Sequence, residues 1–204
     1  MEYPGNYLPA WQETVAKFAT EQNPQSMAKL SGAQYDENKK VFQLKFFNEL
    51  YEIAFPSGEI TAKDSQRELG LGDKTLLLQY LLGACALERP QGWLSFKDLP
   101  AGVHHYNPFV LEAIVPLVRY FGTDEERVQK ACLALNAEEI EGRNKFFIVK
   151  ALPKVILGLA HWPGSTNEQS MFNILFDRSA ILHLDTVALY MLGISFSYKL
   201  LSAV

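Results

Sequence analysis

Apolar side chains recur at helical spacing in several separate stretches of the chain. Residues 10–30 show this pattern, and Asn23-Pro24 closes it. A second stretch follows Asp73, a residue type that caps helix N-termini, and runs to about Glu88 with apolar residues on nearly all sides. Because a helix that is apolar all round is normally buried, the sequence predicts a central helix over residues 76–86.

Polar residues mark three further helix starts. Asn107 before Pro108 predicts a cap followed by a first-turn proline, and Pro116 inside the same apolar pattern predicts a kink or a break. The segment TDEE, beginning at Thr123, has the form of a capping box for the next helix. Asp185 is expected to cap a C-terminal helix whose apolar residues face inward.

Short runs of β-branched and aromatic residues alternate with turn residues elsewhere in the chain. The runs 41–47 and 50–55 flank Asn48-Glu49, which predicts a hairpin that ends at Pro56. Residues 31–40 are rich in glycine and charge, and we interpret them as a loop. Further extended segments are predicted at 93–96, 146–149, 154–162 and 171–176.

Helices and hairpin-type strands are interspersed without a β-α-β rhythm. This order predicts an α+β fold in which one mainly antiparallel sheet is packed with several helices, including the helix over residues 76–86. At 204 residues the chain suits a single domain. We expect an N-terminal helix and loop extension over residues 1–40 and a single α+β domain over residues 41–204.

The charge and the apolar stretches narrow the classes of partner. A net charge of −4 and a pI near 5.6 give no basic field, so binding to a nucleic-acid backbone is disfavoured. The first residues lack the basic and apolar regions of a signal peptide. The longest apolar stretches, near 76–87 and 187–204, are too short or too interrupted to span a bilayer. Cys85 and Cys132 form no CxxC motif. We therefore expect a cytoplasmic protein with neither a membrane nor a nucleic acid as partner.

The densest polar chemistry in an apolar setting lies at residues 172–185, FNILFDRSAILHLD. One apolar run places Asp177, Arg178 and Ser179 at its end, and a second brings His183 and Asp185 to the start of the last helix. An adjacent acid and arginine at a strand end can bind a carboxylate or phosphate through the planar guanidinium. They can equally cap a helix and pair locally, because adjacent residues of a strand point to opposite faces.

Two other segments carry side chains that could border the same pocket. His105 and Tyr106 stand just before the predicted helix start, where free amides can receive an anion and the tyrosine ring can stack on a planar ligand. His161 and Trp162 end a strand and offer a polar group beside an aromatic wall. Each segment also has an ordinary structural interpretation, the first as a polar loop and the second as the rim of the core.

The four histidines lack the spacing of a metal site. Zinc ligands usually come in pairs that are close in sequence, such as HxxxH, with a third ligand from elsewhere in the chain. Among the four histidines, only His104 and His105 are close in sequence, and they are adjacent. No metal ligands are therefore assigned. Ser179, His183 and Asp185 are close in sequence and could serve a hydrolase, but no GxSxG motif accompanies them.

The order of several motifs resembles a known family. LLLQYLLGA is followed by GWLSFKDLPAG, HHYNPF, LVRYFG, ALPKVILGLAHWPG and ILFDRSA. Over roughly residues 41–200 this arrangement is similar to an uncharacterised bacterial domain-of-unknown-function family (number thirty-seven eighty-six), seen mostly in anaerobes. Many relatives carry an iron–sulfur module ahead of this domain, which we do not find here, and of the acidic pair usual after Trp-Pro-Gly only Glu168 remains. The resemblance implies a fold and an anaerobic context, without a reaction.

These features together predict a non-catalytic accessory domain that binds a small ligand or cofactor of unknown identity. The candidate ligand-binding residues are Arg178, Asp177, His161, Trp162, His105, Tyr106, His183 and Asp185. The family resemblance implies that such a domain serves anaerobic metabolism linked to corrinoid or iron–sulfur cofactors. Two alternatives stay open: a hydrolase-like enzyme with His183 or His161 as its base, and a protein-interaction domain with an exposed apolar patch.

Overall fold

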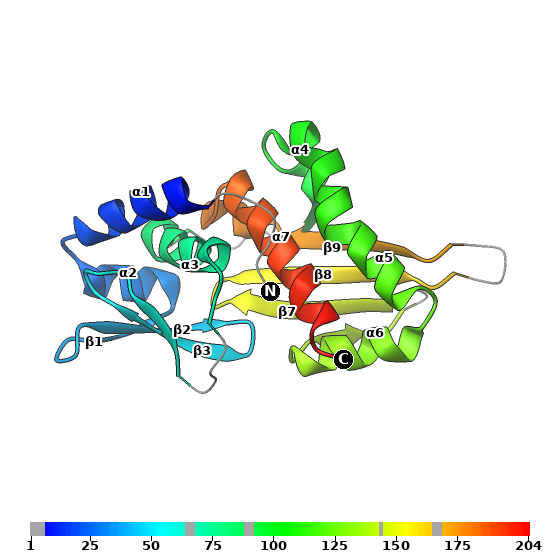
Figure 1. The fold of residues 1–204 in the computed structure, drawn as a ribbon, viewed down its shortest axis with the longest axis horizontal. Coiled ribbons are helices and arrows are strands. Elements are labelled where there is room, and N and C mark those ends of the chain that lie inside the picture. Colours follow the sequence, from blue (N-terminus) through cyan, green and yellow to red (C-terminus); the bar gives the residue numbers. More distant parts are fainter. Residues whose placement is uncertain (1–6, 64–67, 88–91, 143–144, 165–168) are drawn as a thin grey trace.

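The strands form two antiparallel sheets (Figure 1). A computed structural model of the chain describes residues 7–63, 68–87, 92–142, 145–164 and 169–204. The first sheet has the order β1-β2-β3-β4 and the second the order β5-β9-β8-β7-β6. The strands are β1 (Gln34–Asp36), β2 (Val41–Phe46), β3 (Glu49–Ala54), β4 (Ile60–Ala62), β5 (Trp93–Ser95), β6 (Glu138–Ile140), β7 (Lys145–Leu152), β8 (Val155–Trp162) and β9 (Met171–Asp177).

The prediction of a single α+β domain with antiparallel strands is confirmed, whereas the prediction of one continuous sheet is wrong. Most paired strands are consecutive along the chain, whereas β5 pairs with the distant β9, and α3 lies between β4 and β5, the first strand of the second sheet. The sheets meet at one end of β2 and β7, where the amide of Phe47 donates a 2.7 Å hydrogen bond to the carbonyl oxygen of Ala151.

Residues before position 41 are part of the first sheet and of its core. β1 pairs with β2, so part of the segment predicted as a loop is a strand. The ring of Phe18 is fully buried, with its centroid 5.9 Å from that of Phe42 in β2. The boundary at residue 40 stays a prediction, with these contacts running across it.

The helices lie beside the first sheet and across one face of the second (Figure 1). They are α1 (Leu8–Ala19), α2 (Pro24–Ser31), α3 (Leu71–Gly83), α4 (Gly102–Phe109), α5 (Val115–Phe121), α6 (Glu125–Ala134) and α7 (Thr186–Leu201), with 3₁₀ turns η1 (Phe96–Asp98) and η3 (Ala180–Leu182) and a π turn η2 (Val110–Ile114). The helix predicted over residues 76–86 is α3, and its leucines 76–78 are fully buried. α3 ends at Gly83, before the predicted end near Glu88, because the backbone of Ala84 is already extended; Glu88 itself lies outside the described residues.

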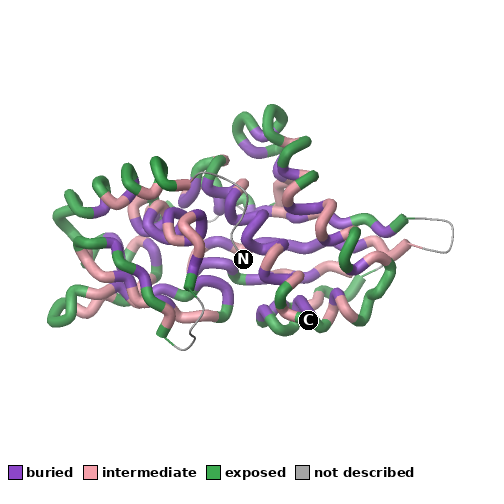
Figure 2. Tube along the Cα trace, viewed as in Figure 1, coloured by how far each residue is buried: buried purple, intermediate pink, exposed green. Residues whose placement is uncertain are grey.

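The core runs through the strands of the second sheet, α3 and α7, with exposed residues at the periphery (Figure 2). In α7, Gly193 allows close packing, because a Cβ atom there would stand 2.5 Å from Cε2 of Phe109 and 3.4 Å from Cζ of Phe176. This contact fixes α7 between α4 and strand β9. The same contact positions the long α4–η2–α5 helix over the end of the second sheet.

Several helix starts differ from the predicted ones. Asp185 caps α7 as predicted, since its Oδ1 accepts from the amide of Ala188 at 2.8 Å. The cap of α6 is Asp124, which accepts from the amide of Arg127, so the predicted start at Thr123 is one residue early. Asp73 lies inside the first turn of α3, behind Gly70, where its carboxylate still faces the helix N-terminus.

Two prolines have different effects on the helix between residues 102 and 121. The predicted start at Asn107 is wrong: α4 begins at Gly102, and Pro108 is accommodated near its C-terminal end. The irregularity predicted at Pro116 is confirmed, because a π turn over Val110–Ile114 ends just before it and α5 restarts with the proline in its first turn. Near the N-terminus, Asn23 separates two helices, α1 and α2, and its side chain caps the second.

Candidate functional site

Asp177 is the last residue of β9 and is buried, whereas Arg178 is the first residue of the turn that follows and is exposed. Asp177 is 3% exposed and accepts hydrogen bonds from the amide and the hydroxyl of Ser179. Arg178 is exposed, and its backbone amide donates to the carbonyl of Gly92 at 2.9 Å. The acid thus stabilises the turn that leaves the strand. Arg178 does not line any of the three cavities whose volumes are about 330, 480 and 650 Å³.

His183 and Asp185 line a small cavity of about 330 Å³ between α1, α3 and α7. Nδ1 of His183 and Oε1 of Gln79 are buried there without a hydrogen-bond partner in the described part of the chain. Burial lowers the pKa of His183, and the nearby charge of Lys154 lowers it further. Asp185 is already engaged as the cap of α7. His183 is therefore held as a neutral imidazole.

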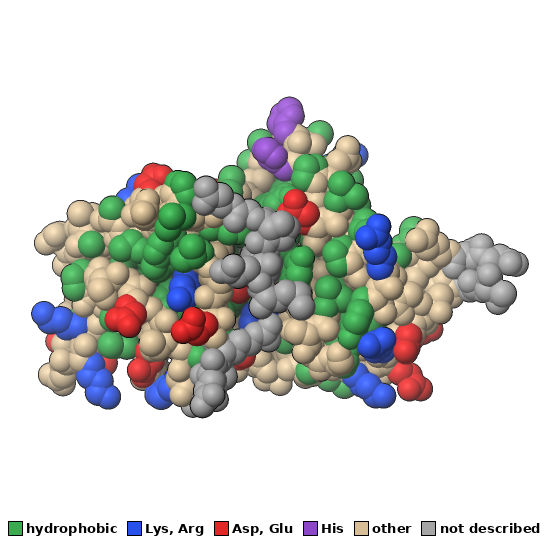
Figure 3. All heavy atoms as spheres, in the orientation of Figure 1, with side chains coloured by type: hydrophobic (Ala, Val, Ile, Leu, Met, Phe, Trp, Pro, Cys, Tyr) green, Lys and Arg blue, Asp and Glu red, His purple; other side chains and the backbone are tan. Residues whose placement is uncertain are grey.

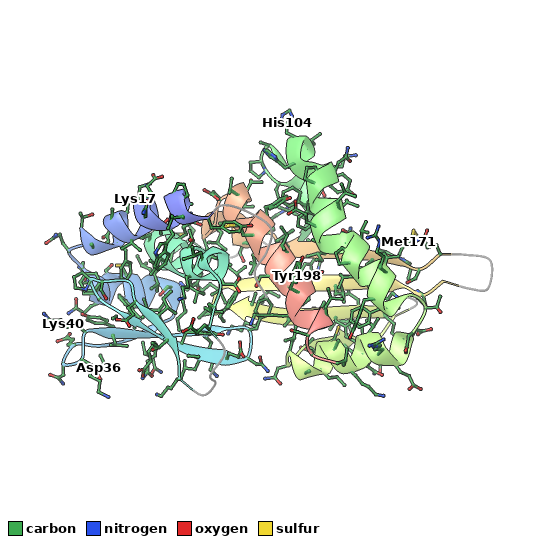
Figure 4. All side chains as sticks on the ribbon, viewed as in Figure 1. Lys17, Asp36, Lys40, His104, Met171 and Tyr198 are labelled. Carbon is green, nitrogen blue, oxygen red and sulfur yellow. The ribbon has the colours of Figure 1, made fainter. Side chains whose placement is uncertain are left out.

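Tyr106 and Trp162 line a larger groove of about 650 Å³, which lies between the helix and the end of β8 and β9. Its helix wall consists of Val110, Ile114, Val115, Val118 and Arg119, and its sheet wall of Gln169, Ser170, Met171, Phe172 and Asn173. Figure 4 shows Met171 at the outer end of β9, beside α5. The volume lies in the range of small-molecule sites, and apolar walls with a few polar groups are their usual composition.

The helix wall owes its shape to the π turn. A π turn inserts an extra residue into the helical repeat, and such turns are frequent at functional sites. Here the inserted turn over Val110–Ile114 precedes Pro116, whose ring and missing N–H disfavour a regular helix. Tyr106 lies before the turn and Arg119 after it, and both side chains reach the same groove.

His161 is buried directly behind the sheet wall of the groove. Its ring stacks on Phe172 at 4.3 Å between centroids, and its Nε2 lies 3.0 Å from Oγ of Ser170. Because the Ser170 hydroxyl donates to the carbonyl of Trp162 at 3.3 Å, we assign the proton of the imidazole to Nε2. Nδ1 is then a buried acceptor with no donor among the described residues. Burial lowers the pKa of His161, so the ring is neutral at pH 7.

His104 and His105 are exposed on α4. Figure 3 shows histidine side chains at the tip that α4 forms, and Figure 4 labels His104 there, directed away from the rest of the molecule. Of the eight predicted site residues, the structure therefore brings together Tyr106 and Trp162, with His161 behind them. It places His183 and Asp185 at another cavity, and Asp177, Arg178 and His105 apart from both.

Arg119 is the charged groove residue that was not predicted as a site residue. It belongs to the motif LVRYFG, and Pro116 alone signalled that this helix would be irregular. Glu168, which the family resemblance had drawn in, lies outside the described residues. In the described ranges, no group of three histidine, cysteine or acidic side chains is placed to hold a metal ion, and no helix is long and apolar enough to cross a membrane.

The fold and the groove define a single α+β domain of two antiparallel sheets. The chain belongs to the family described as "Domain of unknown function (DUF3786)", whose model matches residues 23–199. Neither the curated proteins nor the solved structures give a match to this chain. The predicted family is thus confirmed, and membership of this family does not assign a reaction to the chain.

Proposed function

We propose that this chain is a non-catalytic binding domain for a small planar organic ligand that carries an anionic group. The ligand lies in the groove between the α4–η2–α5 helix and the end of β8 and β9. The observation that carries the proposal is the pairing of an aromatic wall, Trp162 and Tyr106, with a cation, Arg119, that has no carboxylate partner in the described chain.

The groove chemistry supports this class of ligand. Aromatic and aliphatic side chains favour a flat apolar body, and indole and phenol rings add stacking contacts. A guanidinium offers planar, paired donors that suit a carboxylate, sulfonate or phosphate. Asn173 on the opposite wall supplies a further hydrogen-bonding group. A ligand held between the two walls would therefore contact both types of chemistry.

The hydrolase alternative has one observation in its favour, the 3.0 Å contact between His161 and Ser170. The Ser170 hydroxyl already donates to a backbone carbonyl, and no carboxylate contacts His161 in the described residues. An activated serine needs a base that accepts its proton and a third group that orients the base. Labelling of Ser170 by a fluorophosphonate would favour the enzyme over the binding domain.

The test uses the fluorescent probe 8-anilinonaphthalene-1-sulfonate, which joins a flat, apolar naphthalene ring system to an anionic sulfonate. We expect saturable binding to the parent and a loss of about tenfold in affinity in Arg119→Gln, which removes one charge-assisted contact. Trp162→Ala should weaken binding by a similar factor. Arg178→Gln, with the same change of charge at the strand end, should bind as the parent does.

This set of variants separates the groove from the strand-end junction. If Arg178→Gln loses the probe and Arg119→Gln retains it, the ligand site lies at the junction instead. Equal affinity in all variants would show that the probe binds elsewhere, and the proposal would fail. If the proposal holds, native mass spectrometry with an absorbance spectrum of protein purified without oxygen should reveal a natural ligand in the parent. Arg119→Gln should not retain that ligand.

A further inference from the structure

A third cavity, of about 480 Å³, lies where the two sheets meet and shares no lining residue with the aromatic groove. Strand β2 and the turn after it contribute Lys45, Phe47 and Asn48. Strand β7 contributes Lys150, and the turn after α6 contributes Asn136. No residue of the helix wall described above takes part, so this cavity is independent of the proposed function.

Backbone irregularities converge on this cavity. Phe47 and Asn136 have left-handed conformations, with φ of 53° and 55°, which non-glycine residues seldom adopt. The pairing of β7 with β8 shifts between Lys150 and Leu152, which leaves Ala151 as a bulge. A bulge re-aims neighbouring side chains and is frequent beside functional sites. Here the carbonyl of the bulged residue accepts from Phe47, and Lys150 faces the cavity.

The cavity is cationic in an acidic protein. None of its lining residues is acidic, although the chain carries a net charge of −4. Lys45 and Lys150 are exposed and form no ion pair in the described ranges. Like charges across a cavity repel each other, and an anion between them removes that repulsion.

Carboxamides supply the remaining polar groups. Asn48 is held in place because its Nδ2 donates a 2.8 Å hydrogen bond to the carbonyl of Ala134. Asn136 and Gln34 line the cavity without a side-chain hydrogen bond in the described residues. Amide groups both donate and accept, so they suit the oxygen atoms of a bound anion as well as neutral parts of a ligand. Phe47 and Leu152 provide an apolar floor.

We propose that this inter-sheet cavity binds a small organic oxyanion, a phosphate or carboxylate attached to a compact apolar group. The anion lies between Lys45 and Lys150, with carboxamide donors beside it and the apolar group against Phe47. Phosphate and carboxylate share the chemistry that the cavity recognises, so the experiment must separate them.

The experiment follows the side-chain amide signals of Asn48 and Asn136 by NMR during titration of ¹⁵N-labelled protein at low salt. Phenyl phosphate and phenylacetate represent the two anions, and benzyl alcohol is the neutral control. We expect saturable shifts with at least one anion and none with the alcohol. The anion that binds more tightly identifies the class of ligand.

The variants compare lysines inside and outside the cavity. Lys45→Gln with Lys150→Gln should weaken anion binding by about tenfold or more, since two charge-assisted contacts are lost. Lys39→Gln, in the turn of the same sheet, and Arg119→Gln, in the aromatic groove, should leave it unchanged. Absence of saturable shifts with both anions, equal binding of benzyl alcohol, or an equal loss in Lys39→Gln would overturn the proposal, whatever the outcome at the groove.

Discussion

The amide of Phe47 donates a 2.7 Å hydrogen bond to the carbonyl oxygen of Ala151, and this bond joins the two sheets. The Phe47 ring continues the junction into α7, where it stacks on Phe196 with centroids 5.8 Å apart and planes at 16°. A left-handed turn residue is therefore also a buried aromatic anchor. The junction links the first sheet, the bulge of β7 and the last helix.

Phe47→Ala should lower the free energy of unfolding by about 3–5 kcal/mol, the range for truncating a buried phenylalanine. The side chain is 5% exposed, and alanine keeps the unfavourable φ while losing the ring contact. Urea unfolding measures the change, with Tyr35→Ala on the half-buried outer strand as a comparison. A loss below about 1 kcal/mol would mean that the ring does not hold the sheets together.

Leu81 tests whether α3 is central. Its side chain is 1% exposed, so Leu81→Ala should cost about 2–5 kcal/mol through the cavity that it leaves. Leu133→Ala makes the same change on α6 at a side chain that is 54% exposed, and its unfolding midpoint should stay close to that of the parent. Similar midpoints for the two variants would show that the inward face of α3 is wrongly assigned.

A partly buried ion pair is formed by Lys199 in α7 and Glu49 in β3, with 3.0 Å between the charged atoms. The ammonium also lies 5.1 Å from the centre of the Phe46 ring. Lys199→Ala should cost about 1–3 kcal/mol, less than a fully buried pair, because Glu49 is partly exposed and keeps its bond from Tyr51. Lys17→Ala, which breaks an exposed pair with Glu13, should leave the unfolding midpoint unchanged within error.

Stability should fall on the acid side of neutrality because of two buried histidines. Burial lowers the pKa of both His161 and His183 in the folded state. The unfolded chain then binds protons more readily, so the free energy of unfolding is level above about pH 7.5 and falls as the pH drops through about 6.5.

Urea unfolding at several pH values between 7.5 and 5 measures this fall in stability. Most carboxylates titrate below that range, so they contribute little to it. His161→Gln and His183→Gln should each reduce the loss of stability across this range, whereas His104→Gln, at the exposed tip of α4, should show the loss of the parent. A parent whose stability does not change with pH would refute the assignment of neutral, buried imidazoles.

The sequence predicted the fold class because its evidence was local. The cap at Asp185, the buried α3 and the long strands of the second sheet all follow from patterns within about fifteen residues. The short strands β1, β4 and β6 were missed because three residues seldom show a periodicity, although the equally short β5 was predicted. Asn107 misled because an asparagine before a proline has the same signature inside a helix as at its start.

The candidate site was harder to predict because it depends on which residues meet. Tyr106 and Trp162 were both predicted as site residues, and the structure places them in one groove, but Arg119 lines the same groove from beyond the π turn, which the sequence does not reveal. Arg178 attracted attention through its neighbour Asp177, although β9 ends at Asp177 and the arginine lies exposed in the turn that follows. The two lysines of the inter-sheet cavity are separated by more than a hundred positions and carry no motif.

The most direct test of the binding-domain proposal is an NMR titration of ¹⁵N-labelled protein with 8-anilinonaphthalene-1-sulfonate, followed at the backbone amides. We predict that the saturable shifts cluster in residues 110–119 and 170–173, on the two walls of the groove, and that Arg119→Gln abolishes the cluster at the same probe concentration. Shifts that cluster around His183 and Asp185, or at the Asp177–Ser179 turn, or that spread over the surface without saturating, would contradict it.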